Sequence, residues 1–463
     1  MNKMKRIIAL TAAVLSFNAL MAQEDSVVVA KVISEEPISG GTSEKSLSVG
    51  KVKFKPYGFV RNYFYYDSRQ NIQSNAGLYN QIPKDESWNE THDEDLNDVS
   101  TANFLAITSR LGLDISGVHA LNADLSAKFE TDFCGFASST TMLRIRQAYM
   151  KMKWQHNSIL AGQTWHPMSG DLPDVLGLAS GSPFQPFSRS PQIRYDYTVG
   201  KMRYTLAAIW QFQYKSVGPN GKSDEYQTKA IMPEFFIGLD YANEKGFQIG
   251  AGLDMLRIRP RTTTDYVYDK KILVIDTVFD ADNNVKEVNE VEKIVSDTTK
   301  RIVKEYAFSV SPMMFINYKK DKFLLRWKGV FGQNTAHLNM MSGYGVVGIN
   351  EDGSRDYAPL RSFSTWLNLS YGSKVKGNLF LGYFNNFGTS KAILGDLYVN
   401  GASNIDYIWR ICPAITYNVN KLTLGLEYEL TTVGYGPRNI FGEAVADHTV
   451  ANNRICAMIK YAW

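Results

Sequence analysis

One pattern recurs along most of this chain: stretches of about 10 to 13 residues in which apolar and polar side chains alternate. In LNADLSAKFETDF, Leu125 and Phe129 share one face of an extended chain, and Asp124 and Lys128 share the other. The final RICAMIKYAW alternates in the same way. Strands of soluble proteins usually have about five or six residues, whereas a tilted strand that crosses a bilayer needs about ten. The length of the alternating runs therefore favours strands that cross a membrane.

The connections between these runs alternate between short and long. Sixteen runs can be placed, at 54–66, 103–115, 121–133, 143–154, 157–164, 190–198, 202–214, 231–241, 246–257, 306–318, 322–332, 361–371, 377–386, 406–417, 421–430 and 453–463. Short links such as TVGK and NVNK alternate with long ones such as 165–189 and 258–305. Short turns at one end and long loops at the other are typical of outer-membrane barrels. The alternative is a secreted sandwich of two sheets, in which short and long connections are not expected to alternate. The sequence predicts an all-β fold, a 16-stranded antiparallel transmembrane β-barrel with short periplasmic turns and long extracellular loops.

The amino-terminal region predicts export. A basic MNKMKR is followed by an apolar run that ends in small residues, so residues 1–22 are predicted to be a cleaved signal peptide. Residues 23–53 are predicted to be a periplasmic linker, and residues 54–463 the barrel. An uncleaved anchor helix is the less favoured alternative. The predicted location is the cell outer membrane.

Composition excludes some classes of protein. Removing residues 1–22 takes away three basic residues and leaves 47 Lys and Arg against 46 Asp and Glu, so no nucleic-acid partner is expected. The three cysteines are few and far apart, which gives no disulfide framework. The 26 Tyr, 24 Phe and 8 Trp suit a barrel with aromatic girdles at the two membrane interfaces.

The polar face of each strand carries arginines. Arg144 and Arg146 lie two positions apart in LRIRQAYMKMKW and so leave the strand on the same side. A charge in the lipid midplane costs about 2–4 kcal/mol, so we expect this face to line the barrel interior. The alternation slips at Gln147 and Ala148, which predicts a β-bulge there. The residues predicted to line or constrict the interior are Arg61, Arg110, Arg144, Arg146, Arg194, Arg326, Arg410, Asp171 and Asp174.

Sixteen strands enclose an aqueous opening, and charged side chains in a pore select solutes by sign. A set of inward arginines is consistent with a preference for anions. In the alternative, the arginines neutralise interior acids such as Asp124, Glu130 and Asp132 and form a structural network. For any single arginine that alternative is the commoner outcome.

The third long loop, 165–189, is the predicted constriction. It is rich in Gly, Pro and Ser, and long loops without structure of their own are often functional. If it folds into the barrel, Asp171 and Asp174 would face the wall that bears Arg110, Arg144 and Arg146 and set up a transverse field. The alternative is an external loop with exposed acids.

The longest loop, 258–305, predicts an extended hairpin that stands above the membrane. Arg257, Arg259 and Arg261 lie at its base. Phosphates of lipopolysaccharide are possible partners for them, although ordinary rim charges are the commoner case.

Three stretches together resemble the DcaP-like porin family: YGFVRNYFYYDSRQ at 57–70, LRIRQAYMKMKW with LAGQTWHPM, and SPQIRY at 190–195. The resemblance implies a trimeric outer-membrane barrel for uptake of anionic solutes such as dicarboxylates. Carried over residue by residue, it points to Arg61, Arg144, Arg146 and Arg194 as channel-lining positions. The coiled-coil segment of that family has no counterpart here, because residues 23–53 contain no heptad repeat. A homotrimer would therefore form through the barrel walls.

The predicted function is passive: a porin for small hydrophilic solutes, with a preference for anions, with outer-membrane lipid and lipopolysaccharide around it, and without cofactor or metal. Alternatives are an adhesive or binding barrel and a substrate-specific channel for hydrophobic solutes. An outer-membrane enzyme is disfavoured because G-x-S-x-G is absent from the sequence and the histidines show no recognisable catalytic or metal-binding spacing. Those histidines are His92, His119, His156, His166, His337 and His448.

Overall fold

The computed structural model describes residues 46–136, 141–179, 181–279, 282–283 and 285–463 of the chain. The predicted signal peptide and most of the predicted linker lie outside these residues. Within them, helices are confined to α2 (Glu225–Thr228) and the 3-10 turn η1 (Ala336–Leu338), and no helix is long and apolar enough to span a membrane.

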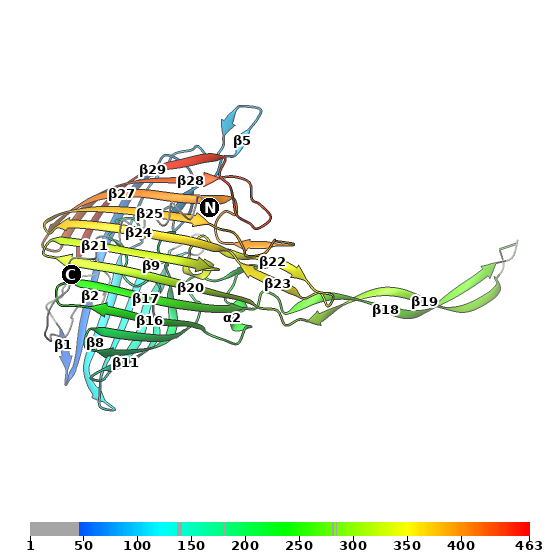
Figure 1. Cartoon of the computed structure of the whole chain (residues 1–463), viewed down its shortest axis with the longest axis horizontal. Coiled ribbons are helices and arrows are strands. Elements are labelled where there is room, and N and C mark those ends of the chain that lie inside the picture. The colour runs from blue at the N-terminus through cyan, green and yellow to red at the C-terminus, as the bar shows by residue number, and fades with distance from the viewer. Residues whose placement is uncertain (1–45, 137–140, 180, 280–281, 284) are drawn as a thin grey trace.

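The main element is a closed antiparallel barrel (Figure 1). Its sixteen strands, in order around the wall, are β2 (Val52–Asp67), β8 (Arg110–Ala120), β9 (Ala123–Phe136), β10 (Thr141–Lys153), β11 (Asn157–Trp165), β12 (Arg189–Val199), β13 (Met202–Ile209), β16 (Glu234–Ala242), β17 (Phe247–Ile258), β20 (Ala307–Lys320), β21 (Phe323–Gln333), β24 (Arg361–Gly372), β25 (Val375–Asn386), β27 (Ile405–Val419), β28 (Leu422–Tyr435) and β29 (His448–Ala462). The barrel closes because β2 pairs with β8 along its first half and with β29 along its second half. Each predicted segment overlaps one of these strands, so the predicted fold is confirmed.

The short connections lie at one end of the barrel. Five are two-residue turns, at 121–122, 200–201, 321–322, 373–374 and 420–421. In four of them the first residue has a positive φ, as Asp321 and Asn420 have at +52°. Turns of this hand match the right-handed twist of paired strands, so they join neighbouring strands with little strain. The carboxyl terminus lies at this same end (Figure 1).

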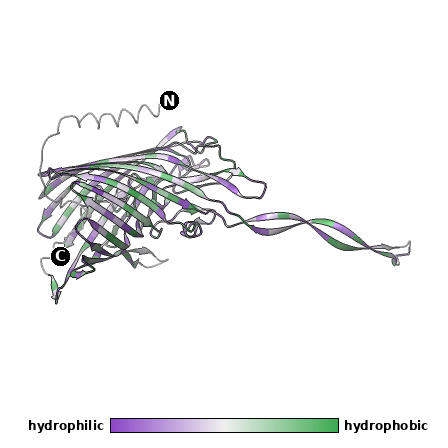
Figure 2. Cartoon of the chain, turned by 60° about the horizontal axis from the view of Figure 1, so that its bottom comes forward, coloured by the Kyte–Doolittle hydropathy of each residue, from purple (hydrophilic) through white to green (hydrophobic). Residues whose placement is uncertain are grey.

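The two faces of the wall have opposite character. Outward side chains are apolar and exposed; Leu206, Ile237 and Leu426 are about half exposed. Inward side chains are polar and buried, as Glu130 and Asn368 are. Figure 2 shows the resulting alternation of hydrophobic and hydrophilic positions along the strands. The prediction that the polar stripe faces the interior is therefore confirmed, because hydrocarbon can accept only the apolar face.

Further strands add to the barrel or lie in the long loops. Two pair with β2, namely β1 (Leu47–Val49) and β7 (Thr101–Leu105). The others are β3 (Asn71–Ser74), β4 (Tyr79–Pro83), β5 (Trp88–Asn89), β6 (Glu94–Asp95), β14 (Val217–Gly218), β15 (Gly221–Lys222), β18 (Thr263–Phe279), β19 (Val285–Ile302), β22 (Gly343–Ile349), β23 (Arg355–Pro359) and β26 (Leu397–Val399).

The long loops also fill part of the barrel. Ile82 of β4, Phe184 of loop 165–189 and Met341 of the β21–β22 connection join one apolar cluster. The cluster packs against inward side chains of the later strands, including Trp366 and Phe380. Burial of apolar surface stabilises by about 25 cal/mol per Å². The cluster thus holds three loops against one side of the interior.

The hairpin predicted for 258–305 is confirmed. Its strands β18 and β19 pair along their length and project far beyond the barrel (Figures 1 and 2). At its base, Arg261 forms an ion pair with Glu305 at 2.8 Å. Burial opposes ionisation of Glu305, but hydrogen bonds from Arg261 and Tyr357 outweigh it and hold the pKa of Glu305 below its usual value. Arg259 donates to the carbonyl of Val303, so it also fixes the hairpin base, whereas Arg257 donates to the carbonyl of Ala230, outside the hairpin.

Candidate functional site

Loop 165–189 runs across the interior of the barrel. The backbone N–H groups of Leu176 and Gly177 donate to the two carboxylate oxygens of Glu427 on β28, at 2.5 and 3.0 Å. The hydroxyl of Tyr63 on β2 donates to the carbonyl of Leu176 at 2.6 Å. On another side, Ser364 of β24 donates to the carbonyl of Phe184. The expectation that this loop enters the barrel is confirmed by these contacts.

A buried lysine holds the start of the loop. The ammonium group of Lys328, on β21, donates to the carbonyl oxygens of Met168 at 3.2 Å, Ser169 and Asp171. Its side chain is only 2 % exposed. Backbone carbonyls thus replace water around this cation, and the loop cannot leave without stranding a buried charge.

Two predicted lining arginines also hold loops. Arg326 on β21 donates to the carbonyl of Leu172 at 3.0 Å. Arg410 on β27 donates to the carbonyls of Ser182 and Gln81 and contacts Glu429 at 3.4 Å. We call Arg326, Lys328, Arg410 and Glu427 the anchoring wall, because each of them contacts loop 165–189.

The acids of the loop contact the same side of the barrel. Asp174 contacts Arg326 at 3.4 Å and also pairs with Lys376 of β25. Asp171 accepts a hydrogen bond from Asn317 of β20. The interpretation that these acids face Arg110, Arg144 and Arg146 was wrong, because Asp174 pairs with Arg326 and Lys376, and Asp171 accepts a hydrogen bond from β20.

The first half of the barrel presents a different set of cations. Arg144 binds Asp132 of β9 through two hydrogen bonds, at 3.0 and 2.8 Å. Arg146 bridges Glu130 and Asp132 at 2.7 and 2.9 Å, and Arg110 lies 3.5 Å from Glu130. The strand register shifts around Arg146, next to the predicted bulge. Two buried acids therefore hold three arginines inside the barrel.

Arg61 and Arg189 extend this cationic surface. Arg61 donates from Nε to the hydroxyl of Thr108 at 2.9 Å, and its guanidinium lies over the rings of Phe59 and Tyr63. The guanidinium of Arg189 lies 4.3 Å from the ring centre of Trp165. Stacking on aromatic faces keeps a guanidinium oriented without cancelling its charge.

A cavity of about 70 Å³ separates this surface from loop 165–189. Four arginines line it, and no carboxylate occurs among the described residues at its wall. The loop contributes apolar side chains, among them Leu172 and Leu176. We call the four residues Arg61, Arg110, Arg146 and Arg189 the arginine wall.

A larger cavity of about 190 Å³ lies beside the same loop and extends towards the short turns. Its lining has mixed charge. Arg194, a predicted lining residue, faces it but contacts Asp196 at 3.2 Å. The other charged side chains of its wall are Lys128, Arg203, Asp171 and Asp240.

Two groups of potential metal ligands lie in the described part of the chain. One consists of Cys412, Glu427 and Glu429, in which the two carboxylates already bind loop backbone or Arg410. The other consists of His166, Glu234 and His337.

Sequence patterns had no means of finding several of these residues. Arg189 precedes Arg194 by five positions, so strict alternation places it on the outer face, yet it is buried inside. His166 and His337 lie 171 positions apart in the sequence, and only the fold brings both to Glu234. The alternation along each strand predicts that Lys328 and Glu427 point inward, but it does not predict which groups they contact.

Comparison with known proteins gives a family match over part of the chain and a fold. Residues 11–221 match the family model of the DcaP outer membrane protein, which confirms the resemblance noted above. The crystal structure of the outer membrane channel DcaP of Acinetobacter baumannii is similar, with a TM-score of 0.61 and 18 % identity over 90 % of this chain and 99 % of that one. No curated protein matches this sequence.

Two other solved barrels align less well. OmpT of Vibrio cholerae gives a TM-score of 0.48 with 11 % identity, over 90 % of this chain and 100 % of that one. An anion-selective porin from Comamonas acidovorans gives a TM-score of 0.49 with 9 % identity, over 89 % of this chain and 100 % of that one.

Proposed function

We propose that this chain is an outer-membrane porin through which small hydrophilic anions pass by diffusion, and the match of residues 11–221 to the family model of the DcaP outer membrane protein supports this proposal. No covalent chemistry is involved. Solutes move down their gradient, and the barrel interior discriminates among them by size and charge.

The observation that carries the proposal is the lining of the 70 Å³ cavity, with four arginines and no described carboxylate. Two unit charges 4 Å apart interact by about 1 kcal/mol even in bulk water, and more strongly where protein excludes water. An anion that enters this cavity meets several such charges at once, whereas a cation meets repulsion from each.

The solute class we propose is small dicarboxylates and similar anions. Arginine presents a planar fork of donors that matches a carboxylate with two parallel hydrogen bonds. Several guanidiniums around one cavity can accept two carboxylates of one solute. The apolar side chains of Leu172 and Leu176 on the loop face the carbon chain between them.

The proposed assembly is a homotrimer formed through the outer barrel wall. Exposed apolar side chains surround the barrel, so the wall can contact either lipid or another copy. Cross-linking in native membranes, followed by gel electrophoresis without heating, should give a species of three chains. A species of one chain only, with or without the cross-linker, would contradict the trimer.

The channel proposal is tested by single-channel recording in a planar bilayer. We expect ion conductance with a reversal potential, under a salt gradient, that shows anion preference. Liposome permeability should decrease in the order dicarboxylate, neutral polyol of similar size, diamine. Absence of conductance would end the channel proposal, and equal permeability for the three solutes would end the anion preference.

A second candidate is a binding role for the β18–β19 hairpin. This hairpin projects beyond the barrel and exposes apolar side chains such as Val267, Leu273 and Ile294. Deletion of residues 263–302 separates the two functions. If the protein is purely adhesive, the deletion should abolish its binding to cells or matrix, and neither form of the protein should show solute selectivity. If the protein is a porin, its conductance should survive the deletion.

A further inference from the structure

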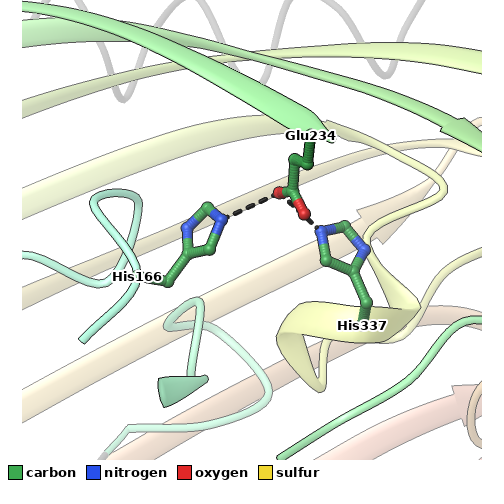
Figure 3. A group of neighbouring side chains, drawn as sticks. All are labelled: His166, Glu234 and His337. Carbon is green, nitrogen blue, oxygen red and sulfur yellow. Dashed lines mark hydrogen bonds and ion pairs between the residues drawn. The ribbon is translucent and has the colours of Figure 1, made fainter. Parts of the chain in front are cut away.

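Four side chains outside the arginine wall form a buried cluster with the donor atoms of a metal site. His166 follows β11, Glu234 begins β16, and His337 lies in η1. Nε2 of His166 lies 2.8 Å from Oε1 of Glu234, and Nε2 of His337 lies 2.9 Å from the same oxygen. Figure 3 shows both imidazoles directed at one carboxylate.

A second carboxylate adjoins the first. Oδ1 of Asp254, on β17, lies 3.9 Å from Nε2 of His166. The side chains of His166, Glu234, His337 and Asp254 are all at most 3 % exposed. Two carboxylates and two imidazoles therefore meet in a volume that water does not reach freely.

Three polar atoms of the cluster lack a hydrogen-bond partner among the described residues: Oε2 of Glu234, Oδ1 of Asp254 and Nδ1 of His337. Buried polar atoms in native proteins are nearly always satisfied, so unsatisfied ones call for an explanation such as a bound ion. Two carboxylates buried side by side also repel each other at low dielectric unless a proton or a cation lies between them. A cation satisfies both conditions.

We propose that His166, Glu234, His337 and Asp254 bind a divalent transition-metal ion, with Zn²⁺ as the preferred ion. Imidazole nitrogen and carboxylate oxygen are common zinc ligands, and four of them suit its usual coordination number. Mg²⁺ and Ca²⁺ prefer oxygen ligands alone, so the two imidazoles select against them. The ligand atoms of His166, Glu234 and His337 already lie within 4.8 Å of one another.

Coordination requires each neutral imidazole to carry its proton on Nδ1, because the metal takes the lone pair of Nε2. Nδ1 of His337 has no described partner and can take that proton. Nδ1 of His166 accepts the backbone N–H of Met168 at 3.2 Å, and the metal-bound form gives up this hydrogen bond. Metal binding is therefore coupled to the backbone at Met168, whose carbonyl accepts a hydrogen bond from Lys328.

The site joins three parts of the chain that shape the interior. His166 begins loop 165–189, Glu234 belongs to the wall, and His337 belongs to the β21–β22 connection. A metal ion would fasten the start of the constricting loop to both. This role is independent of solute selectivity and does not rest on the proposed channel function.

The test uses the full-length barrel in detergent after removal of metals with a chelator. Addition of CoCl₂ should produce the visible absorption of Co²⁺ with nitrogen and oxygen ligands, saturating at one ion per chain. ZnCl₂ should abolish this absorption by competition, and MgCl₂ should not. Absence of a saturable Co²⁺ spectrum in wild-type protein would overturn the proposal.

Variants then locate the ion. Glu234→Gln and His337→Gln should each weaken Co²⁺ and Zn²⁺ binding at least about tenfold. His156→Gln is the matched control, because His156 lies in a short turn at the other end and contacts the carbonyl of Thr198. Unchanged binding in a cluster variant that folds would overturn the site.

Folding of each variant is checked by the shift in gel migration that barrels show on heating. If neither Glu234→Gln nor His337→Gln folds, Asp254→Asn takes their place. If that variant also fails, the stoichiometry and spectrum of the wild-type protein decide, since an ion bound elsewhere without imidazole would lack the nitrogen-ligand signature.

Discussion

The two sides of the barrel interior use the same residue types for different purposes. On the arginine wall, Arg110 and Arg146 are held from behind by acids of β9 and present their other side to a cavity. On the anchoring wall, Arg326 and Arg410 donate to backbone carbonyls of the loops. The guanidinium groups of the first wall pair with acids of the barrel, whereas those of the second wall bind loop backbone.

This difference shows that inward orientation alone does not make an arginine part of a solute path. What decides is the group that satisfies its donors. An acid behind the guanidinium fixes it in place and leaves a face towards the cavity, whereas a loop carbonyl in front of it fills the space that a solute would need.

The largest expected effect is on stability at the arginine wall. Arg146→Ala removes the cation that bridges Glu130 and Asp132, and breaking a buried pair costs about 3–5 kcal/mol. The free energy of unfolding in lipid vesicles, measured by tryptophan fluorescence in urea, should fall by about that amount. Arg61→Gln, whose Nε donates to a neutral hydroxyl, should cost less than about 1.5 kcal/mol. Equal losses in both variants would refute the distinction.

The next effect concerns the anchoring wall. Glu427→Ala removes the acceptor of two loop N–H groups, and hydrogen bonds to charged groups contribute about 1.5–3 kcal/mol each. The loop should then leave its position in part, so single-channel conductance and current noise should both increase. Glu225→Gln, on exposed α2, serves as the control. An unchanged conductance would mean that Glu427 does not hold the loop.

A smaller effect should separate the walls by selectivity. Arg61→Gln removes one charge of the cavity lining, worth about 1 kcal/mol for each permeating ion, so the anion-to-cation permeability ratio should fall at least about fivefold. Arg326→Gln removes an arginine from the anchoring wall and should change conductance more than the ratio. Reversal potentials under a salt gradient measure both. If the two variants shift the ratio equally, the walls are not distinct.

The smallest effect is expected at the loop acid. Asp174→Asn should change the permeability ratio by less than about twofold, because Arg326 and Lys376 already neutralise this carboxylate and the remaining field is screened. The same reversal-potential measurement applies. A large rise in anion preference would instead indicate that Asp174 faces the solute path, as the sequence had suggested.

The sequence was sufficient for the barrel because strand signals are local. A period of two over ten residues and a two-residue turn such as 321–322 can be identified without knowing what packs against them. The inward direction of Arg144 and Arg146 followed from the same period, since lipid rejects charge. The bulge beside Arg146 was also predictable, because the alternation of apolar and polar residues breaks there.

The path of loop 165–189 is determined by partners far away in the sequence. Asp174 meets Lys376, and Gly177 meets Glu427, across 202 and 250 positions. No periodicity encodes such contacts, so the entry of the loop was predicted correctly but the wall that its acids face was not. The cluster of His166, Glu234 and His337 was hidden for the same reason.

The β18–β19 hairpin places part of the chain far from the barrel. A 17-residue strand at about 3.3 Å per residue is about 55 Å long, so its outer end stands well clear of the pore mouth. In the proposed porin, an external partner would meet this stalk before it meets the barrel. Because the ion pair of Arg261 and Glu305 lies at the base of the stalk, changes in its outer sequence leave that contact and the barrel interior in place.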